Sequence, residues 1–96
     1  SAAKTAEDFA TRYPKSPQSI NALLRSAQTF EQMGQLSEAS RVLSKLADRD
    51  EKASNRWREL SADFSALSGN PGEARRIYNE LKSLILRKEL SFCHKL

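Results

Sequence analysis

The chain is predicted to be all-α, and three observations support this fold class. Only three glycines and three prolines occur in 96 residues, whereas Ala, Leu, Glu, Lys, Arg and Gln are common, which favours helix over strand. Apolar residues recur at i, i+3, i+4 and i+7, the spacing of one buried helical stripe. A pattern of about 35 residues also repeats along the chain. Together these features predict an α-α superhelix of stacked antiparallel helical hairpins.

The internal repeat becomes visible when residues 20–49 are laid over residues 55–84. Chance would give about two identities in such a window. The alignment has identities at Ser26/Ser61, Ala27/Ala62, Gly34/Gly69, Glu38/Glu73, Ala39/Ala74, Arg41/Arg76 and Leu46/Leu81. The two segments are therefore predicted to be copies of one helical hairpin.

The first half of each unit aligns better at an offset of 34, which places Asn55 over Asn21. One extra residue therefore lies in the turn between Leu67 and Ala74. An insertion in a turn is tolerated because neither flanking helix has to change its packing register.

About five helices are predicted, near residues 2–13, 17–33, 36–49, 52–68 and 71–90. Their buried stripes are Ala6, Phe9, Ala10 and Tyr13; Ile20, Leu23, Leu24, Ala27, Phe30 and Met33; Leu36, Ala39, Val42, Leu43 and Leu46; Trp57, Leu60, Phe64 and Leu67; and Ala74, Ile77, Tyr78, Leu81, Leu84 and Ile85. Burial of Trp57, Phe64, Ala74 and Tyr78 against one another is expected from this pattern.

Turn and capping residues mark the helix ends independently of the periodicity. Ser16 before Pro17 is typical of an N-cap followed by a first helical proline. Asn70, three residues before a glutamate, is a second candidate N-cap. Gly34 and Gly69 stand where the preceding helices must end in a left-handed conformation.

Acidic residues near other helix starts are interpreted as structural. Asp48 and Asp50 are candidate caps for the helix that contains Trp57. Glu7 and Asp8 are expected to complement the macrodipole of the first helix. Capping is favoured over acid-base chemistry at all of these positions.

These features resemble the tetratricopeptide repeat. In that family a large residue, a leucine, a small residue and an aromatic follow one another in the first helix, and a glycine, a small residue and a bulky residue follow in the turn and second helix. The matching residues are Leu23, Ser26, Ala27, Phe30, Gly34, Ala39 and Leu43, and then Trp57, Leu60, Ser61, Phe64, Gly69, Ala74 and Tyr78.

The resemblance covers residues 17–86, and more weakly residues 2–16. It divides the chain into a trailing helix of a truncated preceding repeat (1–16), two repeats (17–50 and 51–86) and a C-terminal helix extension or tail (87–96). Two departures concern packing between repeats: Leu46 and Leu81 replace a usually small residue, and Glu51 replaces the customary proline.

The resemblance implies a protein-binding scaffold, part of a longer array, and no enzyme. Partners of this family, another protein or a peptide, usually lie in the concave groove formed by the first helices. Carried over position by position, the predicted partner-binding residues are Asn21, Leu24, Gln28, Glu31, Gln32, Asn55, Arg58, Ala62, Ser65 and Ala66. Asn21 and Asn55 could hydrogen-bond an extended peptide backbone, or could simply be exposed polar residues. The lysine and asparagine clamp of co-chaperone members is not matched.

Composition excludes other classes of function. The net charge is +4 with 29% charged residues, but acids and bases alternate, so a nucleic-acid surface is not expected. No catalytic residue, metal site, cofactor or small-molecule substrate is predicted, and Cys93 and His94 are interpreted as tail residues without function. A pentatricopeptide-type RNA-binding array, with its 35-residue unit, remains an alternative. Self-association through the truncated first helix or through residues 84–90, giving a homo-oligomer, is another.

The compartment is only weakly indicated. The stretch FATRYPKSP, residues 9–17, resembles junctions of periplasmic tetratricopeptide proteins, which slightly favours the bacterial periplasm or cell envelope over the cytoplasm. No apolar run approaches the roughly 20 residues of a membrane span.

Overall fold

A computed structural model describes residues 1–95 of the chain and the side chains of residues 1–90. It contains α1 (Ala2–Arg12), α2 (Gln18–Gln32), α3 (Leu36–Arg49), the 3-10 helix η1 (Glu51–Ala53), α4 (Ser54–Leu67) and α5 (Pro71–Lys95). No strand occurs within residues 1–95. The all-α prediction is confirmed, and the last helix continues past its predicted end near residue 90 to Lys95.

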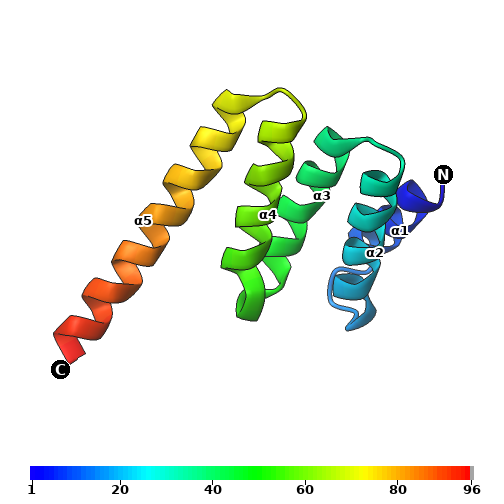
Figure 1. Ribbon diagram of the computed structural model, residues 1–96. Helices are drawn as coiled ribbons and strands as arrows, with labels where there is room; N and C mark the ends of the chain where they lie inside the picture. Colours follow the sequence, from blue (N-terminus) through cyan, green and yellow to red (C-terminus); the bar gives the residue numbers. More distant parts are fainter. Residues whose placement is uncertain (96) are drawn as a thin grey trace.

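The helices form a single row in which each one packs antiparallel against its neighbour along the chain (Figure 1). The Cα atoms span 49 × 33 × 16 Å. The smallest of these extents, 16 Å, corresponds to a row no more than two helices thick, because the axes of packed helices lie about 8 to 10 Å apart. The result is a curved slab of stacked hairpins with two broad faces.

Two glycines end the first helix of each hairpin in the same way. Gly34 and Gly69 have φ values of +76° and +88°. The next N-H groups, of Gln35 and Asn70, donate to carbonyls five residues back at 2.9 Å. This is the Schellman arrangement, and it confirms the predicted role of both glycines.

Helix starts lie at or next to the predicted positions at two places. The Ser16 hydroxyl accepts a hydrogen bond from the Gln18 N-H at 3.2 Å. The Asn70 side-chain oxygen accepts from the Glu73 N-H at 3.3 Å. Asn70 therefore caps α5 as predicted, whereas α2 begins at Gln18 with Pro17 as its N-cap residue, one position later than predicted, and Ser16 bonds to its first N-H group.

The predicted caps of the tryptophan-bearing helix were wrong. The N-cap residue of α4 is Ala53, which offers no side-chain acceptor. Asp50 instead accepts from the Trp57 Nε1-H, and Asp48 pairs with Arg58 at 3.2 Å. The short helix η1 separates these aspartates from the start of α4, so neither reaches its first N-H groups.

Small residues allow close helix packing, as the repeat pattern predicts. Ala27, Ala39 and Ala74 are at most 3% exposed. Ser26 and Ser61, equivalent in the two hairpins, are both fully buried, and each donates to a carbonyl of the preceding helix, at 2.7 and 2.8 Å. The two hairpins therefore share an equivalent interhelical hydrogen bond as well as the same packing of small residues.

The ends of the predicted apolar stripes are exposed. They are Tyr13, Met33, Leu67, Leu84 and Ile85, and Tyr78 within the last stripe is exposed as well. The expectation that Tyr78 is buried was therefore wrong: it is 40% exposed, and its hydroxyl donates to Asp63, which raises the pKa of the tyrosine.

A buried carboxylate ties α1 to α3. Glu7 is 2% exposed and accepts hydrogen bonds from Arg41 and, at 2.6 Å, from Lys45. Glu38 supports Arg41 from within α3 at 2.7 Å. The hydrogen bonds from Arg41, above all, lower the pKa of Glu7 to about 2. Glu7 is therefore an interhelical anchor and not merely the macrodipole partner expected from its position.

Candidate protein-binding groove between α2 and α4

A groove with a volume of about 290 Å³ lies between α2 and α4, and α3 forms its floor. The helix α2 contributes Leu24, Ala27, Gln28 and Glu31; α3 contributes Leu43; and α4 contributes Arg56, Trp57, Leu60 and Phe64. We refer to this surface as the α2–α4 groove. Its floor is apolar and its rim is polar.

The tryptophan in this groove is held in a fixed position. Trp57 is half-buried, and its Nε1-H donates to the Asp50 carboxylate at 2.9 Å. The Arg56 guanidinium carbon lies 6.0 Å from the centre of the indole ring, within the range of a cation-π contact. A rigid aromatic ring with an anchored N-H is well suited to contact a partner, because little conformational entropy is lost on binding.

Polar side chains border the apolar floor. Gln28 and Glu31 on α2 and Arg56 on α4 are exposed on opposite sides of the groove. An amide, a carboxylate and a guanidinium offer both donors and acceptors to a peptide backbone. This arrangement provides apolar contact below and hydrogen bonding along the sides.

The structure brings only some of the predicted site residues together. Leu24, Gln28 and Glu31 line the groove. Asn21 lies instead in a cleft between α1 and α2. Gln32 and Ala66 are exposed but are not among the residues that line the groove.

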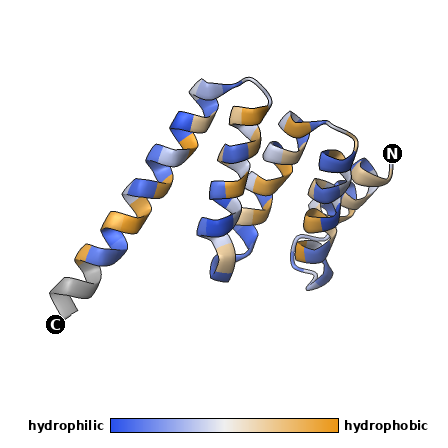
Figure 2. Cartoon of the chain, viewed as in Figure 1, coloured by the Kyte–Doolittle hydropathy of each residue, from blue (hydrophilic) through white to orange (hydrophobic). Residues whose placement is uncertain are grey.

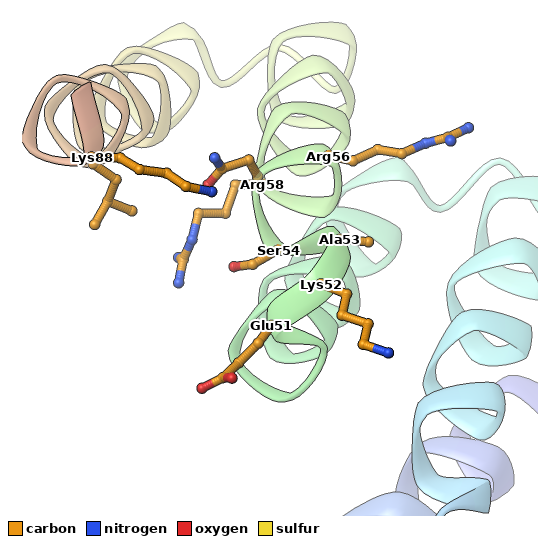
Figure 3. Close-up of a pocket in the computed structure, with 9 residues that line it drawn as sticks. Glu51, Lys52, Ala53, Ser54, Arg56, Arg58 and Lys88 are labelled. Carbon is orange, nitrogen blue, oxygen red and sulfur yellow. The ribbon is translucent and has the colours of Figure 1, made fainter. Parts of the chain in front are cut away.

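Asn55 and Arg58 lie in a third place, a wedge between the start of α4 and the distant half of α5 (Figure 3). In the close-up, the side chains of Arg58 and Lys88 lie near each other in the wedge, while Arg56 points away from them. Asn21 and Asn55 are therefore in separate clefts and cannot act together on one short peptide.

Two predicted contact residues are buried and cannot touch a partner. Ala62 is 0% and Ser65 is 4% exposed. The Ser65 hydroxyl hydrogen-bonds the Ser40 hydroxyl at 2.6 Å, inside the contact between α3 and α4. The prediction for these two positions was wrong because α4, unlike an edge helix, is covered on both sides by α3 and α5.

The error on α4 has a simple geometric reason. A groove between two parallel helices is lined by the sides that face each other, whereas repeat-equivalent positions point the same way on both helices. Leu24 and Gln28 on α2 therefore line the groove, while Arg58, the counterpart of Leu24 on α4, lies in the wedge beside α5. The groove residues missed on α4 are Arg56, Trp57, Leu60 and Phe64, and their apolar spacing had assigned the last three to the core.

Among residues 1–90 there is no group of three or more histidine, cysteine, aspartate or glutamate side chains able to hold a metal ion. Within the part of the chain that the structure describes, none of the helices has the length and hydrophobicity needed to cross a membrane. Cys93 and His94, interpreted as tail residues without function, lie outside the described side chains.

Comparisons of the chain with protein-family models, with curated proteins and with solved structures each gave no match.

Proposed function

We propose that the chain is a protein-protein interaction module of tetratricopeptide type, without catalytic activity, and that it binds a peptide or partner helix in the α2–α4 groove. The observation that carries this proposal is an open groove with an apolar floor, a fixed Trp57 ring and polar rims on both sides. Interface hot spots are enriched in tryptophan and arginine, and the groove presents both at Arg56 and Trp57.

The apolar floor of the groove belongs to the core of the fold, whereas the polar side chains of its rim do not. Gln28, Glu31 and Arg56 form no hydrogen bond or ion pair through their side chains within the described part of the chain. Substitution of exposed side chains away from such contacts usually alters stability by less than about 0.5 kcal/mol. The groove can therefore be changed while the scaffold is left intact.

A triple variant tests this proposal. Peptides selected from a random library for binding to the wild-type chain would be titrated by calorimetry against Gln28→Ala, Glu31→Ala and Arg56→Ala combined. Loss of about 1.4 kcal/mol of contact energy would weaken binding about tenfold. Helicity and the melting temperature should stay unchanged.

A matched control lies on α5. Arg75→Ala, Asn79→Ala and Glu89→Ala remove one guanidinium, one amide and one carboxylate from exposed positions outside the groove. This variant should bind the peptides with wild-type affinity. Equal affinities of the groove variant and the wild type would contradict the proposal.

Self-association is the second candidate function, and one observation favours it. Leu84, Ile85, Leu86 and Leu90 on the distant half of α5 are between 39% and 61% exposed, and hydrophobic residues are visible along this part of the helix, where it diverges from α4 (Figure 2). Sedimentation over a range of concentrations tests it. A single monomeric species throughout would exclude a homo-oligomer formed through α5.

RNA binding of the pentatricopeptide type would be revealed by a different signature. Neutralised phosphates release counterions, so the affinity for single-stranded RNA would fall steeply as salt rises. We expect no such binding, because acids and bases are paired or alternate on the described surface.

A further inference from the structure

The α2–α4 groove carries charges of opposite sign at its two ends. The helices α2 and α4 run in the same direction, because each packs antiparallel against α3 (Figure 1). Arg56 lies in the first turn of α4, and Glu31 lies in the last turn of α2. These are the two charged residues that line the groove, so one end of the groove is positive and the other is negative.

Both charges are available to a ligand. The side chains of Arg56 and Glu31 are exposed, and neither takes part in an ion pair among the side chains that the structure describes. Arg56 points away from the wedge between α4 and α5 and contacts the Trp57 ring (Figure 3). The next acidic residue on α4, Glu59, does not line the groove. A ligand therefore reaches either charge without breaking an internal ion pair.

The helix ends strengthen this polarity. Both α2 and α4 begin at the Arg56 end of the groove and finish at the Glu31 end. Their macrodipoles therefore add positive partial charge beside Arg56 and negative partial charge beside Glu31. Ala53, the N-cap residue of α4, offers no side-chain acceptor that would offset the positive end. Side chains and backbone thus favour the same orientation of a dipolar ligand.

The distance between the two charges follows from the repeat. Phe64 on α4 corresponds to Phe30 on α2, the residue before Glu31, so Glu31 lies near the level of Phe64. Eight residues of helix lead from Arg56 to Phe64, which is about 12 Å at a rise of about 1.5 Å per residue. An extended chain covers this length in about four residues. The floor between the charges is apolar, with Leu60 near its middle.

We propose that the α2–α4 groove selects an extended segment of a partner protein in which an acidic and a basic side chain are about four residues apart, with an apolar side chain midway between them. The acidic side chain pairs with Arg56, the basic one with Glu31, and the apolar one packs on Leu60. Successive side chains of an extended chain alternate between two faces, so all three point into the groove. This proposal rests on the function proposed for the groove and adds which peptides the groove selects.

The occupant is an extended segment and not a helix for two reasons. The groove has a volume of about 290 Å³, whereas two turns of a helix about 10 Å across occupy roughly 850 Å³. A helix also satisfies its own backbone hydrogen bonds, while an extended segment leaves N-H and C=O groups for the rim, where Gln28 provides an amide. The size of the groove and its polar rim therefore both favour an extended peptide.

Three synthetic peptides test the proposal. Each is five residues long, with leucine in the middle, serine on either side of the leucine, and blocked termini without charge. The outer residues are lysine and glutamate in the mixed peptide, glutamate twice in the acidic peptide and lysine twice in the basic peptide. Trp57 is the one tryptophan of the chain, so its fluorescence reports binding in the groove during each titration.

We expect the wild-type chain to bind the mixed peptide about three- to fivefold more tightly than either of the others, because a like charge replaces one partner of an exposed ion pair. This preference should shrink as salt is added, since exposed charges are screened. Arg56→Glu makes both ends of the groove acidic and should bind the basic peptide best. Glu31→Arg makes both ends basic and should bind the acidic peptide best.

The combined variant separates charge pairing from structural damage. Arg56→Glu together with Glu31→Arg reverses the polarity of the groove and should restore the preference for the mixed peptide, which damage by either substitution would not do. In a matched control, Arg75→Glu is combined with Glu89→Arg at exposed positions of α5 outside the groove. The wild-type preference should remain in this control, and circular dichroism should show the same helicity in all variants.

The outcomes distinguish this proposal from the one on which it rests. Saturable changes in Trp57 fluorescence with equal affinities for the three peptides would overturn the charge preference but leave the groove as a binding site. An unchanged preference in both single variants would do the same. No saturable change with any of the three peptides would also overturn the charge preference, whereas the groove itself is tested by the peptides selected from the random library.

Discussion

Two equivalent arginines act differently near the two ends of the helix row: one joins α1 to α3, and the other pairs only within α5. Arg41 on α3 and Arg76 on α5 occupy the same repeat position, and each pairs with a glutamate three residues earlier in its own helix. Arg41 reaches further, to the buried Glu7 of α1. Arg76 turns instead to Glu80 of its own helix at 2.7 Å.

The cause of this difference is a single position. Equivalent serine hydroxyls donate to the Ala3 carbonyl of α1 and to the Ser40 carbonyl of α3, which sets these two residues in register. By this register of α1 on α3, the residue that corresponds to Glu7 is Ser44, whose hydroxyl is hydrogen-bonded to Ser61 at 3.0 Å.

Because Ser44 has no carboxylate, Arg76 on α5 has no partner on α3 like the one that Arg41 has on α1. The junction of α1 with α3 is therefore ionic, whereas α3 and α5 share no ion pair among the described side chains.

A second contact strengthens the same contrast. Arg49 donates to the Ala10 carbonyl in the last turn of α1 at 2.5 Å, where a cation is favoured by the helix dipole. Its repeat counterpart on α5 is Leu84, which is 39% exposed and cannot make such a bond. The comparison teaches that α1 to α4 form a firmly joined platform, while α5 is held by α4 alone.

The largest predicted effect is removal of the buried carboxylate. Glu7→Ala leaves Arg41 and Lys45 without their main acceptor and should destabilise the chain by about 3 kcal/mol in urea titrations. Glu73→Ala at the other junction removes a solvent-screened partner of Arg76 and should leave the unfolding free energy almost unchanged. Equal losses in the two variants would mean that the junctions do not differ.

Acid should weaken the same junction. The pKa of Glu7 lies near 2 in the folded chain, compared with its ordinary value of 4.5. Its contribution to stability is therefore complete above pH 4.5 and is lost as the pH falls through 2, a total of about 3 kcal/mol. Glu7→Gln should remove this dependence, so the difference in unfolding free energy between wild type and variant should shrink steadily from pH 5 to pH 2. A constant difference would contradict the account.

Overpacking should also distinguish the two ends. Ala39 and Ala74 are equivalent and almost fully buried. Ala39→Leu should cost about 2 to 3 kcal/mol because α3 is held on both sides, whereas Ala74→Leu should cost about 1 kcal/mol because α5 can shift away from α4. Thermal unfolding followed by circular dichroism measures both. A larger loss at Ala74 would reverse the predicted order.

The smallest predicted effect comes from building the missing anchor. Ser44 and Arg76 line a common pocket of about 280 Å³ between α3 and α5, so a glutamate at position 44 has space to reach the arginine. Ser44→Glu should stabilise the chain by about 0.5 kcal/mol, and the gain should vanish when Arg76→Ala is added. A double-mutant cycle with no coupling would show that charge at this position does not control the junction.

Much of the fold could be predicted from the sequence, because helix periodicity and turn chemistry are local. Gly34 and Gly69 end helices by their own backbone preference, and Ser16 and Asn70 accept hydrogen bonds from the next turn of their own segment. The small residues Ala39 and Ala74 are buried as their repeat positions suggest.

The binding surface was harder to predict because it depends on how helices turn toward each other. Periodicity places Trp57 and Phe64 on one face of a helix, but it does not state that this face also borders an open groove. Glu7 carried no signal of its own, since its partners Arg41 and Lys45 lie 34 and 38 residues away. Position-by-position transfer failed at Ala62 and Ser65 for the same reason.

Hydrogen-deuterium exchange of the free chain at neutral pH tests the central claim that α1 to α4 form one firm platform and α5 is loosely attached. Amides in regular helix exchange only when the helix opens, so their protection measures the local free energy of opening. We predict similar, strong protection through the middle of α1, α2, α3 and α4, and weaker protection along α5 that falls to a minimum beyond Leu84. Protection of α5 equal to that of α3, or exchange of α1 as fast as that of α5, would contradict the account.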